Sequence, residues 1–333
     1  MRKGNTRSHS ELGSQAFQRR WYFVLRHGRV GHCQAILALM KNYILITGGA
    51  GFVGSNLIEL LLKKTSKKII SLDNYSSGSK KNHIQHRRIK YINGDTTQIS
   101  KILHKYKNKI QTIFHFGEFA RIFQSFKRFD KCFKSNVIGS NAVFKFCLEN
   151  NIKLIYSATS ASLGNNGNDK NLSPYAFSKS KNLELLENLK KWFKFKFEVI
   201  YFYNVYGPKQ IKTGSMATVI GIFEIQYKSK RPLTVVKPGT QTRRFTHILD
   251  TLEVCYDAWK NNNCAHYSIS NHKSYTIKEV AKLFKHKIIY LSSRPGERYA
   301  SALSNMSLNN QVIKKFGKLS LKNYINSFIK AHK

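Results

Sequence analysis

Tyr175 and Lys179 are the side chains whose spacing most clearly permits proton chemistry. Residues four apart on a helix share one face, so the phenol and the ammonium would be neighbours. Free tyrosine titrates at about pH 10, and a nearby positive charge lowers the pKa of a phenol. Tyr256 and Lys260 have the same spacing, but Tyr175 follows a predicted strand of a parallel sheet, where ligand sites form. Tyr175 is therefore a candidate general base and acid that works at an alcohol.

A glycine-rich turn, with Gly48, Gly51 and Gly54, lies between the first predicted strand and the first predicted helix. Such glycines permit a tight turn and a close approach of the backbone to a pyrophosphate, which also meets the free N–H groups of the helix. Asp73 ends the second strand, where a carboxylate accepts hydrogen bonds from the adenosine ribose and repels a 2′-phosphate. The pattern predicts a dinucleotide site that prefers NAD to NADP.

Two more polar positions follow predicted strands. Asp95 comes directly after the third strand, where it is placed to contact the adenine. The run of small polar residues at 157–162 leaves the fifth strand, and a hydroxyl in it could bind the reacting oxygen. In isolation such a run is more often only a loop.

The elements that would position these residues alternate between strands and helices, which is typical of a parallel sheet with crossover helices. The predicted strands are residues 43–47, 68–73, 90–93, 111–116, 153–157 and 197–203. The predicted helices are residues 51–64, 131–150 and 174–192, and Ser173 and Pro174 form the start of the last one. We predict an α/β protein whose doubly wound parallel sheet occupies residues 40–206, followed by a smaller C-terminal part in residues 207–333.

Residues 1–39 differ in composition from the rest of the chain. They hold six of the fifteen arginines but a single lysine, whereas residues 40–333 hold 41 lysines. We expect them to form a poorly ordered extension outside the fold, such as an over-extended start, a fusion remnant or a targeting segment, and assign them no function.

The formal net charge is +40, from 57 lysines and arginines against 17 aspartates and glutamates. Nucleic-acid-binding proteins gather such charge in a stripe or an arm, whereas these lysines are scattered singly and in pairs. The charge indicates a solvated basic surface that helps to attract an anionic small substrate. No specific nucleic-acid partner is expected.

Composition excludes several further classes of protein. With 41% hydrophobic residues the chain can form a core, and no apolar run reaches the roughly 18 residues of a membrane span. The five cysteines (Cys33, Cys132, Cys147, Cys255 and Cys264) show no C-x-x-C spacing. We therefore expect no disulfide framework and no metal site, and a reducing compartment, the cytoplasm.

The ordered motifs of residues 40–333 resemble those of the extended short-chain dehydrogenase/reductase superfamily, in particular the nucleotide-sugar epimerases typified by UDP-glucose 4-epimerase. The matching motifs are TGGAGFVGSNL (47–57), LDN (72–74), GD (94–95), FHFG (114–117), SNVIGS (135–140), YSATSASLG (156–164), SPYAFSK (173–179), FYNVYGP (202–208), TRRFTHILD (242–250) and RPGE (294–297). The resemblance implies a Rossmann NAD-binding domain and a C-terminal substrate-binding α/β subdomain, with part of residues 245–270 returning to the first domain. It also implies a homodimer formed by the helices at 131–150 and 174–192.

The resemblance implies a transient oxidation in which Tyr175 takes a proton from a sugar hydroxyl while the sugar carbon passes a hydride to NAD. The keto-sugar would then turn over and receive the hydride on its other face. Lys179 would bind the nicotinamide ribose and lower the pKa of Tyr175, and Thr159 matches the family's catalytic serine or threonine. The other implied cofactor contacts are Phe52, Val53, Asn74, Phe116, Gly117 and Asn136. The implied contacts to the nucleotide diphosphate sugar are Asn204, Arg243 and Arg294, with Glu297 near the nucleoside ribose.

The residues after Thr159 narrow the reaction. The 4,6-dehydratases of the resembling group carry Asp-Glu there and the UDP-glucuronate decarboxylases carry a glutamate at the second position, whereas this chain has Ser160 and Ala161. Epimerisation needs no additional acid, so we expect a UDP-glucose or UDP-N-acetylglucosamine 4-epimerase. Glu118 stands at a position beside the cofactor that is usually small.

Alternatives remain open at this point. Residues 213–217 (TGSMA) resemble the ADP-heptose 6-epimerases, and other nucleotide-sugar dehydratases or reductases are related. Outside the enzymes, a dinucleotide-binding sensor would use the same fold but would not need Tyr175, Lys179 and Thr159 together.

Overall fold

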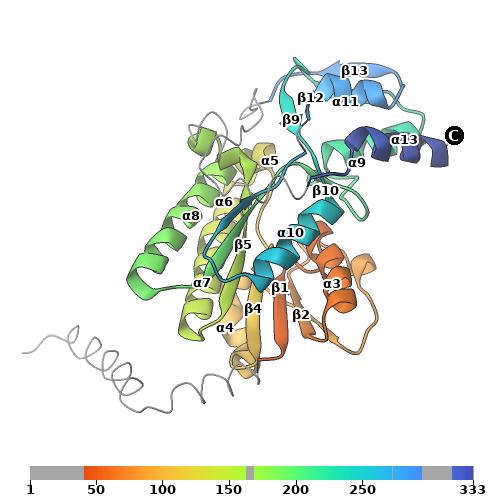
Figure 1. The fold of residues 1–333 in the computed structure, drawn as a ribbon. Coiled ribbons are helices and arrows are strands. Elements are labelled where there is room, and N and C mark those ends of the chain that lie inside the picture. Colours follow the sequence, from red (N-terminus) through yellow and green to blue (C-terminus); the bar gives the residue numbers. More distant parts are fainter. Residues whose placement is uncertain (1–40, 163–168, 272, 295–316, 333) are drawn as a thin grey trace, which may run out of the picture. The chain divides into compact units, whose positions relative to one another are not determined.

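The computed structural model describes residues 41–162, 169–271, 273–294 and 317–332. Residues 43–333 belong to one compact unit, built on a seven-stranded sheet whose neighbouring strands are all parallel (Figure 1). In spatial order the strands are β3 (Ile89–Asn93), β2 (Lys68–Asp73), β1 (Tyr43–Thr47), β4 (Ile110–His115), β5 (Lys153–Thr159), β6 (Phe197–Phe202) and β11 (His266–Ser268). The order reverses between β1 and β4, which is where doubly wound sheets bind their ligands. The predicted fold class is confirmed.

Alternation along the strands divides the core into two layers, because successive side chains point to opposite faces of a sheet. On one face, Ile44 and Ile46 of β1 share a cluster with residues of α3 (Phe52–Lys64) and α10 (Ile248–Lys260). On the other face, Leu45 shares a cluster with residues of α7 (Ser140–Glu149) and α8 (Pro174–Phe193). Figure 1 shows the two helix layers on either side of the strands.

The strand predictions agree with the structure to within two residues, and two differences matter for the site. The predicted helix 131–150 is confirmed as a continuous helical segment over residues 129–149, but its geometry varies: α6 (Phe129–Phe133) and α7 are joined by the π-helical η4 (Lys134–Gly139). Strand β5 extends to Thr159, so part of the polar run that was read as a loop is strand. The seventh strand, β11, was not predicted, because three residues are too few to show a period.

Short helices fill the connections on either side of these strands. They are η1 (Lys80–Asn82), η2 (Thr96–Gln98), α4 (Ile99–Ile102), η3 (His104–Tyr106), α5 (Ile122–Lys127) and η5 (Ser160–Ser162). Of these, η2 follows β3 and η5 follows β5, at the carboxyl ends of the strands.

Apart from α10, which packs on the sheet, the chain between β6 and β11 and the chain after β11 form a third apolar cluster around Phe223, Phe245 and Phe284. The elements here are β7 (Val205–Tyr206), α9 (Val219–Lys228), β8 (Leu233–Val236), β9 (Thr242–Arg244), β10 (Thr246–His247), β12 (Ser274–Thr276), α11 (Ile277–Leu283), β13 (Ile288–Leu291) and α13 (Leu321–Ala331). Strands β8 and β13 are parallel, and β9 and β12 are antiparallel. The division into two domains at residue 206 stays a prediction.

Several predictions concern absences or residues outside the described ranges. The expected extension at 1–39 lies outside them. Within the described ranges, no helix is long and apolar enough to cross a membrane, and no group of histidine, cysteine or carboxylate side chains could hold a metal ion. The four cysteines in these ranges are free thiols.

Candidate active site

The glycine-rich turn after β1 is packed too tightly for side chains, as Gly48 and Gly54 show. Gly48 has a φ of +71°, and a Cβ there would lie 2.9 Å from the main chain of Phe116 and Gly117 after β4. A Cβ on Gly54 would lie 2.3 Å from the carbonyl oxygen of Gly48, so α3 can begin this close to the turn only with glycine. Gly51 is the N-cap of α3 and leaves its first turn uncovered by a side chain. The turn therefore has the form of a phosphate-binding helix start.

The Asp73 carboxylate lies against this turn at the end of β2. Its two oxygens accept hydrogen bonds from the main-chain N–H groups of Ala50 (2.9 Å) and Tyr75 (2.8 Å). Burial raises the pKa of Asp73 above the ordinary aspartate value, and the two hydrogen bonds act in the opposite direction. Asn74 donates to Asp95 at 3.0 Å, so three residues predicted to contact the cofactor (Asp73, Asn74 and Asp95) lie together at the ends of β2 and β3.

Tyr175 lies in the first turn of α8, where Ser173 caps the helix by accepting a hydrogen bond from the Ala176 N–H at 3.1 Å. The phenol is hydrogen-bonded to Thr159 at the end of β5. Burial raises the pKa of Tyr175 to about 12, the Thr159 hydrogen bond lowers it, the Glu118 carboxylate raises it and the Arg121 guanidinium lowers it. The Tyr175 and Thr159 side chains are therefore neighbours, and burial favours the protonated phenol.

Lys179 lies one turn further along α8 and is almost completely buried. Its ammonium forms an ion pair with Glu118, donates to the carbonyl oxygen of Ser157 and lies 4.7 Å from the centre of the Tyr156 ring. Burial lowers the pKa of Lys179, and Glu118 raises it. Sequence reasoning marked Glu118 only as an unusual residue and did not find this ion pair.

Asn136 lies on η4, at the point where the helix widens. Its amide oxygen accepts from the Phe119 N–H at 2.7 Å, and its amide nitrogen donates to the Phe119 carbonyl (3.0 Å) and to Ser178 (3.2 Å). Asn136 thus links the loop after β4 to α8. π-turns inside α-helices are frequent at functional sites.

Arg121 was missed by sequence reasoning. Its Nε and Nη2 atoms donate to the Met216 carbonyl oxygen at 2.9 and 2.5 Å, and its charge acts on the Tyr175 phenol. Its position, four residues after Gly117 on the loop that leaves β4, is the one signal that could have found it.

Of the predicted substrate residues, Asn204 follows the sheet strand β6, and the others belong to the C-terminal part. Asn204 follows β6 with a φ of +36° and donates to the Arg244 carbonyl oxygen at 2.8 Å, next to Arg243 on β9. The Arg294 guanidinium lies 5.1 Å from the ring centre of Phe123 on α5, two residues from Arg121. Glu297 lies outside the described residues.

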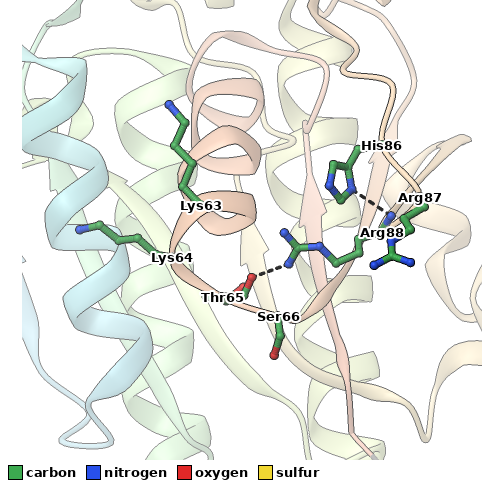
Figure 2. Close-up of a pocket in the computed structure, with 7 residues that line it drawn as sticks. All are labelled: Lys63, Lys64, Thr65, Ser66, His86, Arg87 and Arg88. Carbon is green, nitrogen blue, oxygen red and sulfur yellow. Dashed lines mark hydrogen bonds between the residues drawn. The ribbon is translucent and has the colours of Figure 1, made fainter.

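A basic hollow of about 670 Å³ lies at the amino ends of β2 and β3, at the opposite end of the strands from the candidate active site (Figure 2). It is lined by Lys63, Lys64, Thr65, Ser66, His86, Arg87 and Arg88. These residues precede β2 and β3, whereas ligands of such sheets bind beyond the carboxyl ends of the strands. Arg88 donates to the carbonyl oxygens of Leu62 and Thr65 at the end of α3. We therefore interpret this hollow as a surface depression at the C-terminal end of α3, and not as a ligand site.

The sequence of this chain is similar to those of known sugar-nucleotide enzymes. A sequence model described as the NAD dependent epimerase/dehydratase family matches residues 44–270. UDP-glucuronic acid decarboxylase 3 of Arabidopsis thaliana is 28% identical over 263 residues, 74% of this chain and 74% of that enzyme. ADP-L-glycero-D-manno-heptose-6-epimerase of Brachyspira hyodysenteriae is 28% identical over 257 residues, 73% of this chain and 80% of that enzyme.

Among solved structures, that of UDP-glucose 4-epimerase with UDP-glucose from Thermotoga maritima is similar, with a TM-score of 0.77. It is 23% identical, and the match covers 86% of this chain and 97% of that one. This likeness is one of fold.

Proposed function

We propose that this chain, which belongs to the NAD-dependent epimerase/dehydratase family, is a nucleotide-sugar epimerase that acts on UDP-glucose or UDP-N-acetylglucosamine at C4. The observation that carries the proposal is the Tyr175 phenol, hydrogen-bonded to Thr159 at the carboxyl end of β5 with Lys179 one helical turn away. A phenol so placed can take a proton from a sugar hydroxyl and return it.

The cofactor of the family is NAD, and the residues at the turn fit it. The glycine turn leaves no room for side chains at Gly48 and Gly54, and Gly51 leaves the start of α3 open to a pyrophosphate. The Asp73 carboxylate accepts two main-chain hydrogen bonds and retains lone pairs for ribose hydroxyls. When bound, NAD accepts a hydride from the sugar carbon and returns it. Asp73, Asn74 and Asp95 would hold the adenosine, and Lys179 the nicotinamide ribose.

Epimerisation is favoured over dehydration or decarboxylation because it needs no acid beyond the tyrosine. The two positions after Thr159 are Ser160 and Ala161, both buried in η5. Neither side chain can supply the carboxylic acid that the other two reactions of the family use.

An ADP-heptose 6-epimerase is the second candidate, and one contact favours it. Arg121 beside Tyr175 holds the carbonyl oxygen of Met216, within residues 213–217, the segment that resembles those enzymes. We propose in either case that the C-terminal part holds the nucleotide through Arg243 and Arg294, with Asn204 after β6 also at the diphosphate.

The test is a panel of UDP-, ADP-, GDP- and dTDP-sugars incubated with the NAD-loaded protein, with products identified by NMR. Conversion of UDP-glucose to UDP-galactose, or of the N-acetyl pair, supports the first candidate, and conversion of the ADP-heptose supports the second. A dinucleotide-binding sensor would bind NAD and convert none of them.

We also propose a cytoplasmic homodimer. Apolar side chains are exposed on the helices expected at its interface, among them Phe129 on α6, Ile138 on η4 and Phe177 on α8. The Phe133 ring lies 4.4 Å from that of Phe129 and 6.4 Å from that of Phe177, centre to centre. Light scattering should give twice the chain mass, and Ile138→Glu should give a monomer; a monomeric wild type would contradict the proposal.

A further inference from the structure

Glu118 receives hydrogen bonds from three elements of the site. Ser140 on α7 donates to its Oε1 at 2.7 Å and Tyr156 on β5 at 3.0 Å. From α8, Asn182 donates to the same oxygen at 3.3 Å, and the Lys179 ammonium pairs with Oε2. The side chain is 1% exposed. A group that accepts from four donors is an ionised carboxylate.

The direction of these hydrogen bonds is fixed from the glycine turn outward. Thr47 Oγ1 accepts from the N–H groups of Phe116 (3.1 Å) and Gly117 (3.0 Å), so its own proton is directed to His115 Nδ1 at 2.7 Å. His115 must then carry its proton on Nε2, which donates to Ser140 Oγ at 3.0 Å. Ser140 in turn donates to Glu118. Burial lowers the pKa of His115 to about 4, which agrees with the neutral ring that this chain of hydrogen bonds needs.

We propose that Glu118 is a positioning residue for the Tyr175–Lys179 pair: its carboxylate holds the Lys179 ammonium against Ser157 and offsets the positive charge that Tyr175 experiences. The inference rests on the proposed function, in which Tyr175 is the base, and adds a residue to it. A lysine that was left unpaired would favour the phenolate at all times. With Glu118 beside it, Lys179 still donates hydrogen bonds to its neighbours, but the pair is neutral.

The charged and titratable groups that face this pair come from each element packed against it. Arg121 leads into α5, Cys132 is on α6, and Tyr156 is on β5. Cys132 has a raised pKa of about 11 because it is buried, and burial also raises the pKa of Tyr156. Both are therefore neutral near pH 7, so Arg121 is the cation among these groups that acts on Tyr175.

The test is a titration of Tyr175 in NAD-loaded protein with [13Cζ]tyrosine, whose Tyr175 signal is the one lost in Tyr175→Phe. Glu118→Gln should lower the pKa of Tyr175 by about one pH unit or more. The matched control is Glu224→Gln, which removes a second carboxylate that is 1% exposed and paired with a lysine (Lys212) in the C-terminal part. It should leave the pKa of Tyr175 unchanged.

A double variant keeps the test decisive if Glu118→Gln does not fold, because removal of both charges leaves no unpaired buried ion. Glu118→Gln with Lys179→Met should return the pKa of Tyr175 to the wild-type value. A rise of about one unit or more in the double variant, or an unchanged value in Glu118→Gln, would overturn the inference. Failure of the proposed function is a separate result: Tyr175→Phe would then keep its turnover while the titration still reports on Glu118.

Discussion

Glu118 and Glu224 are two buried carboxylates with nearly the same partners. Each accepts from a tyrosine hydroxyl and a side-chain amide, and each pairs with a lysine. The Lys179 side chain is 4% exposed and the Lys212 side chain is 40% exposed. Glu224 connects α9 to Tyr324 on α13, whereas Glu118 lies beyond the carboxyl end of β4 among the groups that face Tyr175. The same set of partners connects two helices at Glu224 and surrounds the candidate active site at Glu118. Only the place of each carboxylate in the fold distinguishes them.

Among the changes at the candidate active site, Tyr175→Phe should have the largest effect on turnover. Loss of the hydroxyl removes the proposed proton acceptor, so turnover of the sugar nucleotide should fall about 1,000-fold. The fluorescence of bound NADH and the melting temperature should show that cofactor binding and fold are retained. Turnover within a few-fold of wild type would remove Tyr175 from the mechanism.

Lys179 and Lys212 should differ in how much each contributes to the free energy of unfolding. Lys179→Met leaves a carboxylate unpaired in the interior and should reduce the free energy of unfolding by about 3–5 kcal/mol. Lys212→Met removes a half-exposed partner and should cost about 1 kcal/mol or less. Urea unfolding measures both, and equal losses would show that the exposure of the lysine does not decide how much each ion pair contributes.

Protonation of His115 should make stability fall in acid. Its pKa is lowered from 6.5 to about 4 in the folded protein, so the unfolded chain takes up the proton first as the pH falls. The stabilisation is present above pH 6.5 and decreases by about 3 kcal/mol between pH 6.5 and pH 4. His115→Gln should lose this part of the pH dependence in urea unfolding, and an unchanged slope would contradict the lowered pKa.

The smallest effect is expected at the basic hollow. Lys63→Gln and Arg87→Gln together should leave turnover and NAD affinity within about two-fold of wild type, because these side chains lie beyond the amino ends of β2 and β3. A large loss of turnover or of NAD affinity would show that the basic hollow contributes to the active site.

The fold was predictable because six strands are apolar runs of four or more residues. Helix-length segments separate them, and this alternation is visible in the sequence. The glycine turn and Asp73 were predictable because their spacing is local. Glu118 and Arg121 were not, since their partners Lys179 and Met216 lie 61 and 95 residues further along the chain. The π-turn at η4 was missed because a helix that widens by one residue keeps an almost helical pattern of apolar residues.

The seventh strand completes the sheet late in the chain. Glu198 of β6 accepts from the N–H groups of Asn263 (2.9 Å) and Ala265 (2.8 Å), and β11 then pairs with β6. During synthesis the edge of β6 therefore stays open until more than sixty further residues have left the ribosome. The partners of β8 and β9, which are β13 and β12, come later still. A nascent chain halted before residue 266 therefore leaves one edge of β6 unpaired, and an unpaired strand edge is a template for pairing with another chain.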